Sequence, residues 1–177
     1  MKILITGTHC TGKSTLLNEL KKTLPGFKFI GGVTREAKKF GLGINKDGND
    51  HTQLYCACKD VINLLQNKKK NVVYDRSIID SFVYTLYLLQ QGKVLPTTYN
   101  IIKQLFMQYK QEFDYIFWLR PEFEIVDDNV RDTDTEFQAV IDIIFDEISP
   151  IVGNFNMLTG TTEERITQIK KIICQTN

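Results

Sequence analysis

Gly7-Thr8-His9-Cys10-Thr11-Gly12-Lys13-Ser14 follows directly on the apolar segment Ile3-Leu4-Ile5 near the start of the chain. The two glycines, the lysine and the serine have the spacing of a P-loop, in the strand–loop–helix context that this motif requires. Glycine permits backbone conformations that a Cβ would hinder, so successive N–H groups can turn inward and form a nest for phosphate oxygens. We therefore expect the loop to bind the phosphates of a nucleoside triphosphate, with ATP as the cofactor.

Two side chains of this loop have expected roles in the chemistry. Lys13 would bring its ammonium group to the β- and γ-phosphates, and the Ser14 hydroxyl would bind Mg²⁺. A leucine-lined helix after the loop would point the positive end of its dipole at the same anion. The residues expected to contact the nucleotide here are Gly7, Thr8, His9, Cys10, Thr11, Gly12, Lys13, Ser14 and Thr15.

Apolar segments and helical patterns alternate along the rest of the chain. This alternation predicts an α/β fold of the P-loop NTPase type, a three-layer domain in which helices flank a five-stranded, mostly parallel sheet. Strands are expected near 2–6, 27–33, 71–75, 114–119 and 154–158. Helices are expected near 14–24, 52–67, 78–91, 97–112, 136–149 and 162–174. Neither a repeat nor a linker divides the sequence, so residues 1–177 are expected to form a single domain.

The composition narrows the class of protein. A net charge of +1 over 177 residues gives no general attraction to nucleic acid or to an anionic membrane. No apolar run approaches the roughly 20 residues that span a bilayer. The four cysteines are too few and too scattered for a disulfide scaffold. We expect a cytoplasmic protein that neither enters a membrane nor depends on disulfides.

A carboxylate and a guanidinium end the third predicted strand. Asp75 and Arg76 follow the apolar segment 71–74, and ligands of open α/β sheets bind at the carboxyl ends of the strands. Asp75 is thus expected beside the Mg²⁺ ion as a second ligand. The alternative is an ion pair at the protein surface.

A similar group, Thr34-Arg35-Glu36, follows the second predicted strand. Glu36 could accept the proton of an acceptor hydroxyl, and Arg35 could hold a substrate oxyanion. Alternatively, these side chains cap the helical turn at 37–40. Glu36 and Asp75 are both candidates for the general base.

The segment 121–135 is dense in charge and lacks a clear period. It would act as a lid, with Arg131 closing over the γ-phosphate, supplying positive charge and helping to exclude water. Arg120, at the end of the preceding strand, would either assist in this or form a solvated strand terminus.

The motifs together resemble those of the NadR-type P-loop kinases, which include the ribosylnicotinamide kinase domain. More loosely, they resemble those of thymidylate and deoxynucleoside kinases. The resemblance runs through Gly7–Ser14, Thr34-Arg35-Glu36, Gln53-Leu54-Tyr55, Asp75-Arg76-Ser77, 126–131 and 158–165. It implies that Gly160 and Thr161 lie near the adenine and that Asp75-Arg76 binds the acceptor. Because kinases of this size are often dimers, the resemblance also implies a homodimer. Ala37 departs from the thymidylate kinase pattern, in which proline usually stands at this position.

The sequence therefore predicts a kinase that uses ATP and Mg²⁺ to phosphorylate a nucleoside or a nucleoside monophosphate. Arg35 and Arg76 favour an acceptor that already bears a phosphate, with a deoxynucleoside monophosphate first. One alternative is a kinase acting on a nucleic-acid end or a modified base, although no basic stripe with interleaved aromatic residues is present. The other is a non-kinase P-loop ATPase or switch, although the Asn-Lys-x-Asp motif of guanine-specific switches is missing.

Overall fold

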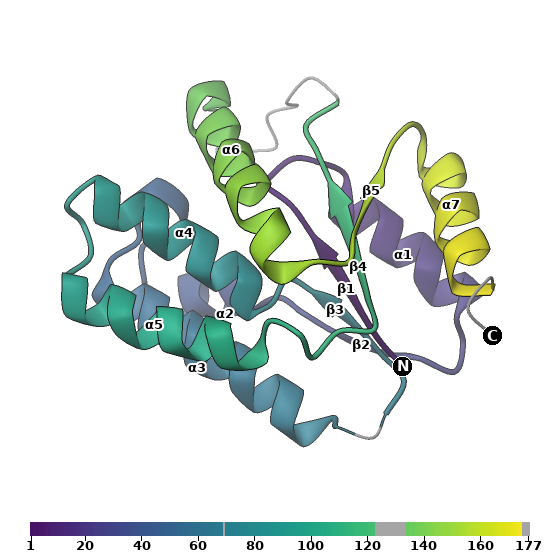
Figure 1. The fold of residues 1–177 in the computed structure, drawn as a ribbon, viewed down its shortest axis with the longest axis horizontal. Helices are drawn as coiled ribbons and strands as arrows, with labels where there is room; N and C mark the ends of the chain where they lie inside the picture. Colours follow the sequence, from purple (N-terminus) through teal and green to yellow (C-terminus); the bar gives the residue numbers. More distant parts are fainter. Residues whose placement is uncertain (69, 123–133, 175–177) are drawn as a thin grey trace.

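The computed structural model describes residues 1–68, 70–122 and 134–174 and is built on one sheet. Its strands are β1 (Lys2–Thr6), β2 (Lys28–Ile30), β3 (Val72–Asp75), β4 (Tyr115–Leu119) and β5 (Phe155–Leu158). They lie in the order β2-β3-β1-β4-β5 (Figure 1). Each pairing between neighbouring strands is parallel. The predicted five-stranded α/β architecture is confirmed.

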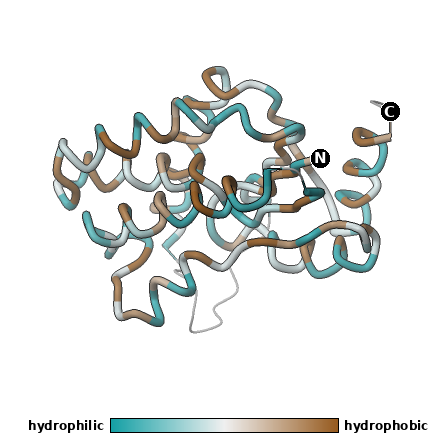
Figure 2. The backbone as a smooth tube through the Cα atoms, turned by 90° about the horizontal axis from the view of Figure 1, so that it is seen from below, coloured by the Kyte–Doolittle hydropathy of each residue, from teal (hydrophilic) through white to brown (hydrophobic). Residues whose placement is uncertain are grey.

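Helices cover both faces of this sheet and produce the predicted three layers (Figure 1). They are α1 (Lys13–Thr23), α2 (Val33–Lys39), α3 (Asp50–Gln66), α4 (Ile78–Gln90), α5 (Pro96–Tyr109), α6 (Thr135–Val152) and α7 (Thr162–Cys174), with a short 3₁₀ turn, η1, at Asn45–Asp47. Brown and teal alternate along the helices in Figure 2, as expected where one side of a helix is buried and the other is exposed.

Successive side chains of a strand point to opposite faces of the sheet, so a hydrophobic cluster forms on each face. In β1, Ile3 and Ile5 pack with α1 and α7, whereas Leu4 packs with the helices α3 to α6. Trp118 of β4 is buried in the same cluster as Leu4, as its place in a central strand predicted. Because both faces are covered, the middle of each central strand is a continuous apolar run and does not alternate with polar residues.

The sequence prediction placed the end of the second strand too late in the chain. β2 ends at Ile30 instead of near residue 33, and Val33 already begins α2. Gly31 and Gly32 separate the two elements, and Gly32 has φ +83°, in the left-handed region that favours glycine. Thr34, Arg35 and Glu36 consequently lie in the first turns of a helix and not at a strand end.

The sixth helix also runs further than predicted, through Pro150 to Val152. Proline removes the N–H that would bond to the carbonyl of Asp146. The hydroxyl of Ser149 donates to this carbonyl at 2.9 Å, which compensates for the missing bond.

Across the ranges 1–68, 70–122 and 134–174, none of the helices has the length and apolar character needed to cross a membrane.

Candidate active site

The loop between β1 and α1 passes close to the end of β4. Gly7 has φ +132°, and a Cβ on it would overlap the carbonyl oxygen of Leu119. Gly12, with φ +85°, caps α1 without a side-chain hydrogen bond. The first N–H groups of α1 are thereby left for a ligand, at the positive end of the helix dipole. The backbone has the form expected for a phosphate-binding loop.

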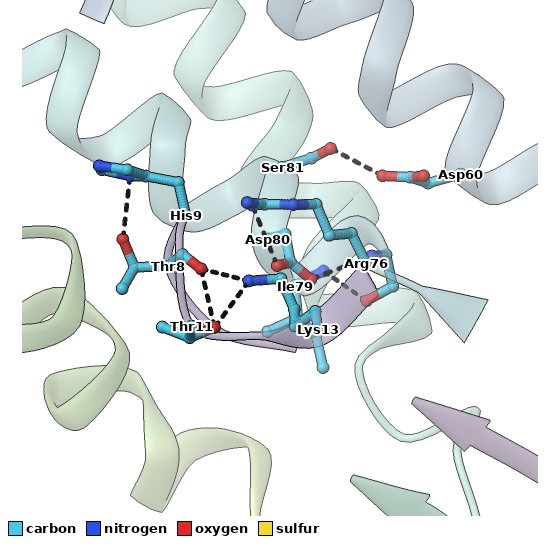
Figure 3. Close-up of polar contacts among 10 residues, drawn as sticks. Thr8, His9, Thr11, Lys13, Asp60, Arg76, Ile79, Asp80 and Ser81 are labelled. Carbon is cyan, nitrogen blue, oxygen red and sulfur yellow. Dashed lines mark hydrogen bonds and ion pairs between the residues drawn. The ribbon is translucent and has the colours of Figure 1, made fainter. Parts of the chain in front are cut away.

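The Lys13 side chain lies in the middle of this loop and is only 7% exposed. Its ammonium donates to the carbonyl of Thr8 and, at 3.0 Å, to the hydroxyl of Thr11 (Figure 3). Burial, followed by the positive charge of Arg76, lowers the pKa of Lys13 to about 7. A polyanion beside this ammonium would offset both effects, so the residues fit the phosphates of ATP.

A cavity of about 350 Å³ opens beside the loop and is bounded by the first turn of α2, by α3, by the end of β3 and by α4. It brings together four of the side chains predicted from separate segments: Lys13, Arg35, Asp75 and Arg76. Ser14 lines it too, and its hydroxyl accepts a hydrogen bond from the Arg35 guanidinium at 3.0 Å. The Ser14 hydroxyl and the Asp75 carboxylate are oxygen ligands of the kind that Mg²⁺ prefers.

Glu36 does not join this group. It is absent from the residues that line the cavity, and its carboxylate pairs with Lys59 of α3 at 3.3 Å. The reason is the early start of α2: Val33 and Ala37 face the core, which turns Glu36 toward α3. Of the two candidates for the general base, only Asp75 lines the cavity.

Arg76 is held in place by a residue that the sequence analysis missed. Its Nη1 lies 3.4 Å from Oδ1 of Asp80, and its guanidinium lies 5.1 Å from the ring centre of Tyr84. Asp80 is buried and forms a capping box with Ser77 at the start of α4. Burial raises the pKa of Asp80, and the charge of Arg76 opposes this. The sequence signal was Ser77-x-x-Asp80, the spacing of a capping box before an apolar helix.

Gly160 and Thr161 lie just before α7, outside the cavity. Arg165 connects their loop to the P-loop: this side chain is 2% exposed, and its Nη1 donates to the carbonyl of Thr11 at 2.8 Å. Its Nη2 donates to Glu122 at 2.9 Å, and the same carboxylate oxygen accepts from the N–H of Gly160 at 2.9 Å. Arg165 shares the buried stripe of α7 with Ile169 and Ile173, a periodicity that could have marked it in the sequence.

Two further predictions concern the end of β4 and the segment after it. Arg120 is no solvated terminus, because it forms ion pairs with Asp142 at 2.8 Å and Asp146 at 2.6 Å on α6. Its guanidinium also lies 4.7 Å from the ring centre of Trp118. Arg131 and most of the predicted lid, 123–133, lie outside the described residues.

The wall of the cavity on α3 and α4 carries a buried acid, Asp60. Burial raises its pKa to about 7, with the hydrogen bond from Ser81 and the charge of Arg76 opposing the shift and the neighbouring Asp80 adding to it. A carboxyl whose pKa is higher in the folded than in the unfolded chain stabilises the fold at low pH, and this contribution is lost as the pH rises toward the folded pKa.

We expect Asp60→Asn to remove this loss, because asparagine carries no charge to desolvate. Between about pH 5 and pH 8, the wild-type free energy of unfolding should fall by roughly 2–3 kcal/mol more than that of the variant. Urea titrations of both proteins at several pH values measure the difference, and other titrating groups cancel in it. Parallel pH profiles would contradict the raised pKa of Asp60.

The comparisons with known proteins agree with this architecture. Residues 2–165 match a family model described as AAA domain, and the match includes the P-loop. The chain belongs to this AAA domain family. No curated protein matches the sequence of this AAA domain chain.

Solved structures share the fold over almost its full length. Deoxyadenosine kinase from M. mycoides, in a structure with the products dCMP and a flexible dCDP, aligns with a TM-score of 0.73 at 19% identity, covering 99% of this chain and 100% of that one. Thymidylate kinase from Candida albicans aligns with a TM-score of 0.75 at 23% identity, covering 99% of this chain and 91% of that one. The AAA domain chain thus has the fold of nucleoside and nucleotide kinases.

Proposed function

We propose that the protein transfers the γ-phosphoryl group of ATP to a nucleoside or a nucleoside monophosphate. The observation that carries the proposal is that Lys13 of the P-loop lines the same cavity as Asp75 and Arg76 at the end of β3. A loop that only hydrolyses ATP needs room for a water molecule beside the phosphates. A cavity of about 350 Å³ is instead within the size range of small-molecule sites. The kinase folds of the solved structures support the same class of reaction.

Each group in the cavity has a part in the proposed transfer. The P-loop backbone and Lys13 would bind the phosphates, and Ser14 and Asp75 would hold Mg²⁺. Bound Mg²⁺ would neutralise charge on the phosphate oxygens. Asp75 would also orient the acceptor hydroxyl or accept its proton, and Arg35 and Arg76 would hold acceptor oxygens. The role of Arg131 over the γ-phosphate stays a prediction, as do the cytoplasmic location and the homodimer.

Several acceptors follow from the observations. Two cationic side chains in the cavity, Arg35 and Arg76, support a monophosphate, with a deoxynucleoside monophosphate as the first candidate. The M. mycoides enzyme is named a deoxyadenosine kinase, which adds the unphosphorylated deoxynucleosides. The sequence resemblance to NadR-type kinases adds nicotinamide riboside.

The test is an ADP-release assay with Mg²⁺ and ATP, run against a panel of nucleosides, nucleoside monophosphates and nicotinamide riboside. We expect one acceptor class to raise ADP release at least about tenfold above the background, and mass spectrometry to find the phosphorylated acceptor. Hydrolysis that no acceptor stimulates would contradict the kinase and favour an ATPase or switch. Stimulation by oligonucleotides alone would indicate a nucleic-acid acceptor.

A further inference from the structure

Two carbonyl groups of the P-loop are bound by side chains from the last two helices. Gln138 of α6 donates from its Nε2 to the carbonyl of His9 at 2.7 Å. Arg165 of α7 donates from its Nη1 to the carbonyl of Thr11 at 2.8 Å. Gln138 is 5% exposed and Arg165 is 2% exposed. The proposed phosphoryl transfer gives neither side chain a part.

The two side chains reach the loop from different directions. α6 packs on one face of the sheet and α7 on the other, so the loop is held from both faces (Figure 1). Neither Gln138 nor Arg165 lines the cavity, whereas Cys10 and Gly12 do. Gln138 and Arg165 therefore contact the loop from outside the cavity.

The direction of each bound carbonyl fixes the direction of the N–H that follows it. The peptide bonds of the loop are trans, and in a trans peptide the C=O and N–H groups share one plane and point to opposite sides. The carbonyl of His9 is turned toward α6, so the N–H of Cys10 points away from α6. The carbonyl of Thr11 is turned toward α7, so the N–H of Gly12 points away from α7. Because both donors stand outside the cavity, we expect both N–H groups to be directed toward it.

The backbone conformation of the loop agrees with this arrangement. Cys10 has φ +59° and Gly12 has φ +85°, both in the left-handed region, whereas Thr11 between them lies outside it. Alternation of this kind is typical of a nest, in which N–H groups converge on an anion. Cys10 carries a Cβ, so its conformation is disfavoured unless its surroundings hold it. The hydrogen bond from Gln138 to the preceding carbonyl stabilises this conformation.

The Arg165 guanidinium is itself fixed on its other side. Its Nη2 donates to the carboxylate of Glu122 at 2.9 Å. Its Nη1 packs against the loop so closely that a Cβ on Gly12 would lie 3.2 Å from it. The planar guanidinium therefore holds the loop in one position, and a lysine could keep the charge but not this two-sided geometry.

We propose that Gln138 and Arg165 are positioning residues of the P-loop, which set the N–H groups of Cys10 and Gly12 for the phosphates of the nucleotide. This inference rests on the proposed function, since it takes ATP as the ligand of the loop. Each residue acts through one carbonyl and does not itself need to contact the ligand. N–H groups that already point at the ligand bind it without the cost of ordering the loop.

Binding of inorganic tripolyphosphate tests the proposal, because this ligand has phosphates but no base or sugar. We would measure its Kd and that of ATP by calorimetry, with Mg²⁺ and without an acceptor. Arg165→Met and Gln138→Met remove the donors, and each should raise both Kd values by the same factor, at least about fivefold. Arg165→Lys should have a smaller effect than Arg165→Met. The matched controls are Lys170→Met and Gln104→Met at exposed positions of α7 and α5, and both should leave the Kd values unchanged.

The amide protons of the loop provide a readout that a general loss of stability would not move. Hydrogen bonds to phosphate oxygens should shift the amide proton signals of Cys10 and Gly12 downfield when tripolyphosphate binds the wild-type protein. Arg165→Met should reduce this shift mainly at Gly12, and Gln138→Met should reduce it mainly at Cys10. The melting temperature of each variant shows whether it is folded. Should Arg165→Met fail to fold, Arg165→Lys and Gln138→Met carry the same test.

The outcomes separate this inference from the proposed function. Unchanged Kd values in the folded variants, a higher Kd for ATP alone, or equal losses of shift at both amides would overturn the inference and leave the kinase assignment in place. If both ligands bind with the expected changes but no acceptor raises ADP release, the inference stands and the proposed function is wrong. A wild-type protein that binds neither ligand would overturn both.

Discussion

Lys13→Ala is expected to lower acceptor-stimulated turnover by about 10³-fold or more, because in the proposed reaction the ammonium would stabilise charge on the transferred phosphoryl group. The side chain is buried at the centre of the P-loop, so no neighbouring lysine can replace it. The measurement is kcat with the best acceptor at saturating ATP, with mass spectrometry of the product to separate transfer from hydrolysis.

The same substitution should not destabilise the protein in the absence of ATP. Burial lowers the pKa of Lys13 from 10.5 to about 7, so the folded chain binds fewer protons than the unfolded chain between these values. As the pH falls from 10.5 to about 7, the free energy of unfolding therefore decreases because the buried lysine resists protonation. Alanine has no group to protonate, so the variant does not lose this stability. Lys22→Ala, on the exposed side of the same helix, is the control and should retain both turnover and melting temperature. Near-normal turnover of Lys13→Ala would refute the assigned role of the loop.

Gly7→Ala is expected to lower the free energy of unfolding by about 3–6 kcal/mol, from backbone strain and overpacking together. At φ +132° an alanine is strained, and its Cβ would overlap the carbonyl oxygen of Leu119. The atom in the way belongs to the backbone of β4 and cannot turn aside as a side chain could. Urea denaturation measures the loss, and binding of ATP should weaken with it because the loop must move away from β4.

Gly26→Ala provides the matched control. A Cβ at Gly26 would meet nothing within 4 Å, and its φ lies outside the positive region. We expect a change within about 1 kcal/mol, with stabilisation the expected sign because alanine restricts the unfolded chain. Equal effects of the two substitutions would show that the close approach of Gly7 to β4 does not constrain the loop.

Sequence patterns predicted the position of a residue correctly where that position depends on neighbouring residues, and failed where it depends on the path of the chain. The P-loop spacing predicted that Lys13 lies in the loop between a strand and a helix, and the apolar segment before Asp75 predicted a carboxylate at the edge of the sheet. Glu36 was misplaced because the break at Gly31 and Gly32 starts α2 early and rotates this side chain toward Lys59. One residue of phase on a helix changes the direction of a side chain by about 100°.

The sequence by itself determined the strand–loop–helix unit, the parallel α/β fold and the residue types at the strand ends, because hydrophobic periodicity and glycine spacing act over a few neighbouring residues. Only the tertiary structure decided which of these groups meet. Asp60 and Ser81 come from different helices, and Arg165 reaches the P-loop from the far end of the chain. Contacts of this kind depend on how the helices pack on the sheet, and packing involves residues that no local pattern connects.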